Sequence, residues 1–290
     1  MMKKLIITLF ALMVTVGMLA GCGDNNTANN NTAAPNNAAP VENGLADGLY
    51  YAEGEYADNG WKEIVAFKVE GGKITSSNWN ALHRDGGLDK KQSSEQGFYG
   101  MKAKGASSEW HEQAALTEKY LLENQDFSAI ILGDDGKTDA ISGVSIHIDG
   151  FTTLLDKAIA AGPVAAGPYK DGHYRAEGAE FDANSGWKET ADITVINGNI
   201  VAASWNGVHK DGGTDKITRS KSGEYGMKAK GASSEWHEQA ALTEKYLLDV
   251  QDPAKVAFHA ADGKTDAIAG VSIHVDGFIE LAIKALEGAK

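Results

Sequence analysis

YGMKAKGASSEWHEQAALTEKYLL occupies Tyr99–Leu122, and the same letters return without change at Tyr225–Leu248. A second recurring stretch follows each copy: TDAISGVSIH at Thr138–His147 and TDAIAGVSIH at Thr265–His274. A structural duplication usually keeps its apolar pattern while surface letters drift, yet here the charged and polar letters are kept as well. We therefore expect these two stretches to form the working surface of each repeat.

The similarity extends outward from these stretches and divides the chain into tandem domains. We place the first domain at 46–162, a Gly/Pro/Ala-rich linker at 163–169 and the second domain at 170–290. The period is far longer than that of solenoid repeats, so the two copies are separate domains and not a stacked array. Strand patterns come first and helical patterns follow in each copy, which predicts an α+β fold with a mostly antiparallel sheet and packed helices.

Local patterns give the expected elements of each domain. Val65, Phe67 and Val69 alternate with polar letters and predict a half-buried strand. Gly71-Gly72 and its match Asn197-Gly198 are suited to two-residue hairpin turns. A loop with Asp85-Gly86-Gly87, or Asp211-Gly212-Gly213, is expected after the hairpin. A helix is expected from about 108 to 122, capped by Ser107 or Ser108, with Trp110, Ala114, Thr117 and Leu121 on one face. A strand at Ala129–Leu132 and a closing helix are expected to follow.

The N-terminus has the pattern of an export signal. Lys3 and Lys4 precede an apolar run in a segment, 1–21, that is too short for an ordinary membrane-spanning helix. Small residues before Cys22, the chain's one cysteine, resemble the lipobox of bacterial lipoproteins, which implies lipidation at Cys22. Residues 22–45 are low in apolar bulk and are expected to be a disordered tether. We therefore expect a protein that is lipid-anchored to the cell membrane on its extracytoplasmic face.

Composition excludes several classes of partner and chemistry. The net charge of −13 disfavours nucleic acid as a partner. There is no glycine-rich nucleotide-binding loop, and the histidine spacings match no zinc pattern, so no metal site is expected.

Aromatic and imidazole side chains recur at matched positions. The recurring set contains Trp79/Trp205, Trp110/Trp236, His83/His209, His111/His237 and Met101/Met227. Flat aromatic rings with a few polar hydrogen-bonding groups suit a planar ring ligand. The alternative is that the tryptophans are core residues and the histidines are polar surface, and the sequence leaves both interpretations open.

The second recurring stretch resembles the flavinylation motif of FMN-binding domains. That motif has a leading Asp, a Gly and an acceptor Thr or Ser, which correspond to Asp139, Gly143 and Ser145 in the first domain. The matching residues of the second domain are Asp266, Gly270 and Ser272. The resemblance implies that a separate flavin transferase moves FMN from FAD onto each serine as a phosphoester. The whole layout, with its lipobox and tether, is also similar to extracellular electron-transfer flavoproteins, including the pheromone-encoding lipoproteins of Gram-positive bacteria.

The motif departs from the family pattern where Val144 and Val271 replace Ala. A β-branched side chain is bulkier and stiffer than alanine, and the sequence leaves open whether it obstructs the transferase. Two functions follow. The first is an electron carrier, and not a turnover enzyme, that takes electrons from a membrane quinone or NADH dehydrogenase and passes them to an external acceptor. The second is a lipoprotein that binds a quinone or another flat ring non-covalently, with no attached flavin. The resemblance also implies a possible peptide signal within the signal segment.

Overall fold

Three antiparallel strands open each repeat in the computed structural model, which describes residues 44–126, 128 and 130–290. The strands pair in chain order, as β1 (Gly48–Glu53), β2 (Trp61–Glu70) and β3 (Lys73–His83), and then as β4 (Gly172–Glu177), β5 (Trp187–Ile196) and β6 (Asn199–His209). The signal segment, Cys22 and nearly all of the tether lie outside the described residues.

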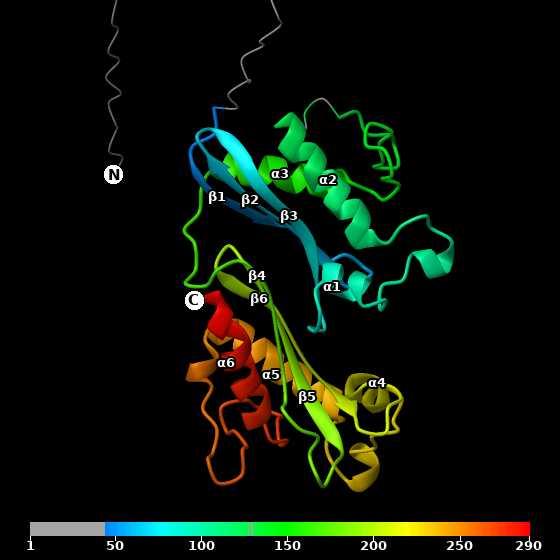
Figure 1. Cartoon of the computed structure of the whole chain (residues 1–290), viewed down its shortest axis with the longest axis vertical. Coiled ribbons are helices and arrows are strands. Elements are labelled where there is room, and N and C mark those ends of the chain that lie inside the picture. The colour runs from blue at the N-terminus through cyan, green and yellow to red at the C-terminus, as the bar shows by residue number, and fades with distance from the viewer. Residues whose placement is uncertain (1–43, 127, 129) are drawn as a thin grey trace, which may run out of the picture. The chain divides into compact units, whose positions relative to one another are not determined.

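Helices follow the strands and cover one face of each sheet (Figure 1). They are α1 (Lys90–Glu95), α2 (Trp110–Asn124) and α3 (Asp149–Ala161), then α4 (Lys216–Lys221), α5 (Trp236–Val250) and α6 (Asp276–Leu286), with short 3₁₀ turns η1 (Lys102–Lys104), η2 (Lys228–Lys230), η3 (Pro253–Lys255) and η4 (Glu287–Ala289). In the first repeat α2 packs on β3, and α3 packs on β1 and β2. The expected α+β fold is confirmed. In the described part of the chain, no helix has the length and apolar character needed to cross a membrane.

The two hairpin turns are where the sequence predicts them. Gly71 and Gly72 have φ of 58° and 71°, and Asn197 and Gly198 have φ of 53° and 71°. Two successive positive φ values are what a two-residue hairpin turn requires, and Gly and Asn tolerate them. An irregularity next to each turn, between Lys68 and Val69 and between Thr194 and Val195, then shifts the register, so that Val65 pairs with Trp79 and Ala191 with Trp205.

The expectation of half-buried strands is wrong for the central strand of each sheet. Val65, Phe67 and Val69 pack under the helices as predicted, but Ile64 and Ala66, on the opposite face of β2, are buried as well. They form a small apolar cluster with Ile196 of β5. The second face of each sheet is therefore also covered, and only contacts between distant parts of the chain reveal this.

The first turn of α2 is capped by a residue other than the predicted serines. Glu109 is the N-cap, and it forms a capping box with Glu112. The Glu109 carboxylate also accepts hydrogen bonds from the backbone N–H groups of Met101 and Lys102, at 2.6 and 3.1 Å. The recurring Glu109 therefore joins η1 to the start of α2 through hydrogen bonds. Glu235 makes the same contacts between η2 and α5. The predicted apolar face of α2 is confirmed, since Trp110, Ala114, Thr117 and Leu121 are all buried.

Two local assignments differ from the sequence prediction. The strand expected at Ala129–Leu132 is absent at residues 130–132, where Ile130 is buried but Ile131 is 86% exposed. Neither of the two sheets in the described part of the chain includes this segment. Conversely, α1 and α4 form where a loop was expected; each is a single short turn capped by an aspartate, Asp89 or Asp215.

Glu244 on α5 should make the stability of the fold depend on pH. Its carboxylate is almost completely buried and accepts a hydrogen bond from the backbone N–H of Trp205 at 2.6 Å. Burial raises the pKa of this carboxyl group to about 7. A raised carboxyl pKa costs stability above that pH, and the cost is absent below the unfolded-state pKa of about 4.5. Glu244→Gln is therefore expected to stabilise the protein by up to about 3 kcal/mol at pH 8 and by almost nothing at pH 4.5. Urea unfolding at several pH values measures this.

Glu118, the match of Glu244 in repeat one, is the control. Its carboxylate pairs with the Lys91 ammonium at 2.6 Å, whereas Ile217 stands at the lysine position in repeat two. The ion pair offsets part of the burial cost, so Glu118→Gln should gain less stability than Glu244→Gln. An equal gain from both changes, or a gain that does not vary with pH, would contradict the assignment.

Candidate ligand site

The two motif serines lie at the surface of loops that are fastened from beneath. Ser145 and Ser272 are exposed. In repeat one, Gln113 Oε1 accepts hydrogen bonds from the backbone N–H of Ser145 at 2.7 Å, from its hydroxyl at 3.3 Å and from Ile146 N–H at 3.2 Å. Gln239 makes the same three bonds in repeat two. Both glutamines are fully buried, so α2 and α5 position the loops that carry the hydroxyls.

The glycines of the motif have the backbone conformation that only glycine adopts without strain. Gly143 has φ of 85° and Gly270 has φ of 84°. The valines that follow pack against the two cores: Val144 is 9% exposed and belongs to the core of repeat one, and Val271 is half-buried against the core of repeat two. Their extra bulk is accommodated by the core while the neighbouring serine stays exposed.

A large cavity in repeat two brings several of the predicted residues together. It has a volume of about 1180 Å³, and Met227, Trp236 and Ser272 are among the residues that line it. Trp187 and Tyr225 add aromatic surface, and Tyr225 lies 6.4 Å from Trp236, centroid to centroid. The first turn of α6 and the loop that joins β4 to β5 complete the wall. Aromatic walls beside one exposed serine make this cavity the candidate ligand site of repeat two.

Lys216 also lines this cavity and was missed by the sequence analysis. The side chain is only 5% exposed, and its ammonium lies 4.3 Å from the Trp236 ring centroid and 3.0 Å from Glu189 Oε1. Lys90 is the match in repeat one, 6% exposed, with its ammonium 4.5 Å from the Trp110 centroid and 4.9 Å from the Tyr99 centroid. The signal was available, because a DGG-x-DK pattern recurs at 85–90 and 211–216.

The buried lysine and carboxylate of repeat one both have shifted pKa values. Burial lowers the pKa of Lys90, and burial also raises the pKa of Glu63, the match of Glu189. Glu63 Oε2 is buried without a hydrogen bond of good geometry. The carboxylate packs against Gly150 in the first turn of α3, and Glu189 lies in the same way against Gly277 of α6.

Other predicted residues lie outside the cavity walls. Trp79 and Trp205 are 0% and 1% exposed and form a layer beneath Trp110 and Trp236. His209 packs edge-on against Trp187, as His83 does against Trp61. The Nδ1 atoms of His111 and His237 are held by Ser94 and Ser220 hydroxyls at 2.9 Å. Asp139 and Asp266 are exposed, and Met101 packs at the edge of the repeat-one core.

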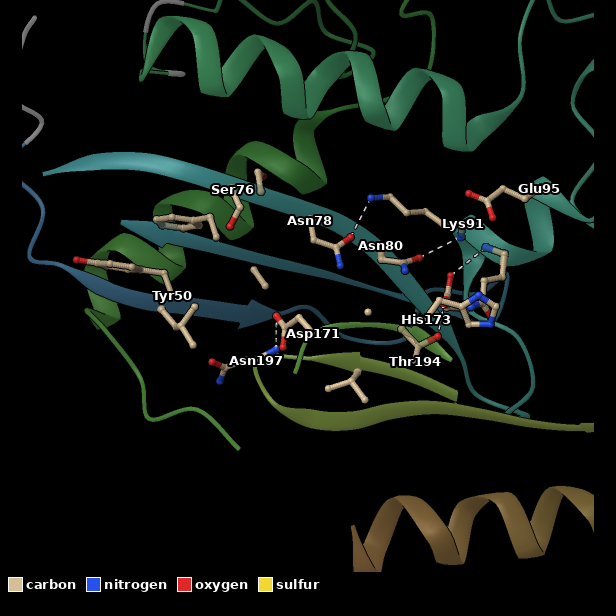
Figure 2. Close-up of a pocket in the computed structure, with 18 residues that line it drawn as sticks. Tyr50, Ser76, Asn78, Asn80, Lys91, Glu95, Asp171, His173, Thr194 and Asn197 are labelled. Atoms are coloured by element: carbon tan, nitrogen blue, oxygen red, sulfur yellow. Dashed lines mark hydrogen bonds between the residues drawn. The ribbon is translucent and has the colours of Figure 1, made fainter. Parts of the chain in front are cut away.

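Figure 2 shows a second cavity, of about 400 Å³, between the strands of the two sheets. Its lining is mainly polar: Asn78 and Asn80 come from β3, His173 from β4 and Thr194 from β5. The Thr194 hydroxyl donates to Asp89 Oδ2 at 2.5 Å. None of the predicted site residues lines this cavity, and its few aromatic side chains do not form facing walls, so the aromatic cavity of repeat two is the better candidate.

Comparisons with known proteins find two similar structures, neither of which has a stated activity. No family model and no curated protein matches this chain. A solution NMR structure of a Clostridium thermocellum protein is 50% identical, with 41% of this chain and 90% of that chain covered and a TM-score of 0.33. A crystal structure of a Clostridium perfringens protein is 26% identical, with 41% and 88% covered and a TM-score of 0.32. Both are structural-genomics targets whose descriptions state no activity.

Proposed function

We propose that this chain is a membrane-tethered, extracytoplasmic electron carrier that holds one FMN per repeat, joined as a phosphoester to Ser145 and Ser272. One observation carries the proposal: the exposed Ser272 hydroxyl borders a cavity of about 1180 Å³ with walls that include Trp187, Tyr225 and Trp236. Ligand pockets of about 300–1,000 Å³ hold drug-sized molecules, so this cavity is large enough for an FMN group. Lys230, Lys264 and Lys284 also line it and supply cations for a phosphate group.

The residues of this chain would bind and orient the cofactor, which supplies the redox chemistry once bound. In the attachment step the serine oxygen forms a bond to the FMN phosphorus of FAD, the pyrophosphate bond breaks, AMP leaves and the serine proton is released. A flavin transferase is the partner for that step. Gln239 holds the loop that carries the exposed Ser272, and the aromatic walls would bind the face of the ring. Electrons would come from a membrane quinone or an NADH dehydrogenase and would pass to an external acceptor.

The test is intact mass and visible absorbance of the chain from Asn25 to Lys290, exported together with a flavin transferase. A yellow protein heavier by two FMN groups is the expected result. A colourless protein of unmodified mass would contradict covalent attachment. That outcome would favour the alternative, a lipoprotein that binds a quinone or another flat ring non-covalently. The aromatic walls support this alternative as well, since they do not depend on the serine.

Lipidation at Cys22 gives a separate prediction. Metabolic labelling with a fatty acid should mark the native chain, and Cys22→Ala should abolish the label and release the protein from the membrane fraction. The reason is that a single thiol supplies the only attachment point, and no other cysteine exists in the chain. Label that persists in Cys22→Ala would contradict the anchor.

A further inference from the structure

Lys90 and Lys216 are buried cations for which the protein provides incomplete partners. Lysine is rarely fully buried unless it is paired, because an ammonium loses its hydration. Lys90 is 6% exposed, and Glu63 is the carboxylate that acts on its charge, although Glu63 Oε2 takes part in no hydrogen bond among the described residues. The aromatic rings around it stabilise the charge but accept no conventional hydrogen bond. The ammonium therefore keeps donors for a group that the protein does not supply.

Lys216 shows where that group would lie. This lysine lines the same cavity as Ser272, and Trp236 and Tyr225 flank its ammonium at 4.3 and 5.7 Å from their ring centroids. Among the described residues Glu189 alone accepts a hydrogen bond from its ammonium, at 3.0 Å, which leaves two of the three N–H donors without a partner there. A cation at the wall of an aromatic cavity selects a flat ring that carries oxygen or nitrogen acceptors at its edge.

From this geometry we infer that Lys216, and Lys90 at the matching position, contact the carbonyl-bearing edge of the bound ring and stabilise the negative charge that the edge gains on reduction. The inference rests on the proposed function, and it deepens it by naming the residues that set the reduction potential. A flavin ring concentrates its added charge at its pyrimidine edge when reduced. A buried cation interacts with this charge more strongly than an exposed one, because solvent screens it less.

Removal of the carboxylate beside Lys216 should shift the reduction potential of the ring in the direction opposite to removal of the lysine. Glu189 neutralises part of the Lys216 charge, so its removal should favour the reduced ring, whereas loss of the lysine should disfavour it. The exposed Lys245, on α5 and outside the cavity lining, is the control, since its charge is screened by solvent.

The experiment uses flavin-loaded protein with Ser145→Ala, which leaves one ring, in repeat two. The ratio of reduced to oxidised ring is read by absorbance at a fixed potential set by a reference dye. Lys216→Gln is expected to lower the ratio at least tenfold, a shift of about 30 mV for a two-electron couple. Glu189→Gln should raise it, and Lys245→Gln should change it by less than about twofold. Circular dichroism establishes that each variant folds.

A second readout does not depend on covalent loading. Riboflavin is titrated into unloaded Ser272→Ala protein, with quenching of tryptophan fluorescence as the signal, and Lys216→Gln should weaken binding several-fold. If Lys216→Gln fails to fold, the Glu189→Gln shift still decides the question. A loaded protein in which neither Lys216→Gln nor Glu189→Gln shifts the ratio overturns this inference and leaves the electron carrier standing. A protein that neither loads FMN nor binds riboflavin overturns both.

Discussion

Ser145→Ala combined with Ser272→Ala is expected to give a colourless protein of unmodified mass after export with a flavin transferase. Each single change should remove one FMN and about half of the visible absorbance. The physical reason is that a phosphoester needs a free alcohol, and these two hydroxyls stand at the surface of loops that Gln113 and Gln239 hold in place. Alanine removes the oxygen and leaves the backbone N–H bonds to the glutamines intact.

The chain offers a matched control for this experiment. Ser142 is exposed in the same loop as Ser145, and repeat two has Ala269 at that position. Ser142→Ala should therefore keep the full FMN mass, and Ser145→Thr should keep it too because threonine retains the alcohol. FMN that stays attached to the double alanine variant would show that another residue is the acceptor. Bound ring without added mass in that variant would favour the quinone-type alternative.

Trp205→Ala is expected to lower the free energy of unfolding by about 3–5 kcal/mol, which is the usual cost of truncating a buried tryptophan. Trp205 is 1% exposed, and its ring centroid lies 5.1 Å from those of Trp236 and Phe278. Alanine would leave a void between β6 and the two helices above it. Urea denaturation followed by far-ultraviolet circular dichroism measures the loss, and Trp79→Ala should do the same to repeat one.

A milder change separates a core role from a ligand role. Trp205→Phe should cost less than Trp205→Ala and leave riboflavin binding unchanged, because Trp205 lies beneath the cavity wall and not in it. Trp236→Phe alters the wall itself and should weaken ring binding. If Trp205→Phe abolished binding without loss of stability, the assignment of Trp205 to the core would be wrong.

Local chemistry explains which parts of the fold were predictable. The hairpin turns at Gly71-Gly72 and Asn197-Gly198 were predicted correctly because positive φ restricts the residue type at each position. The apolar face of α2 was predicted from its spacing. The cap of α2 was not, because Ser107, Ser108 and Glu109 are all plausible caps and only the position of Met101 and Lys102 favours the glutamate. The short helix α1 has too few residues for a periodic pattern to appear.

The candidate site was predictable in part. The recurring letters singled out Ser272, Met227 and Trp236, which line one cavity, but His237 and Asp266 lie elsewhere. Recurrence marks a position as constrained without saying whether the constraint is packing, capping or binding. Trp205 recurs because the core needs it, and Glu109 recurs because α2 needs its cap.

The sequence by itself determined that two α+β repeats follow one another, where their hairpins turn and which hydroxyl follows a left-handed glycine. Each of these depends on residues that are close in the chain, so the local letters suffice. The tertiary structure alone decided that Ile64 and Ala66 are covered on the second sheet face, that Val144 turns into the core, and that Lys216 is enclosed by Trp236 and Tyr225 beside Glu189. Burial and charge pairing between distant residues arise only when the elements pack, and no periodicity in the letters encodes them.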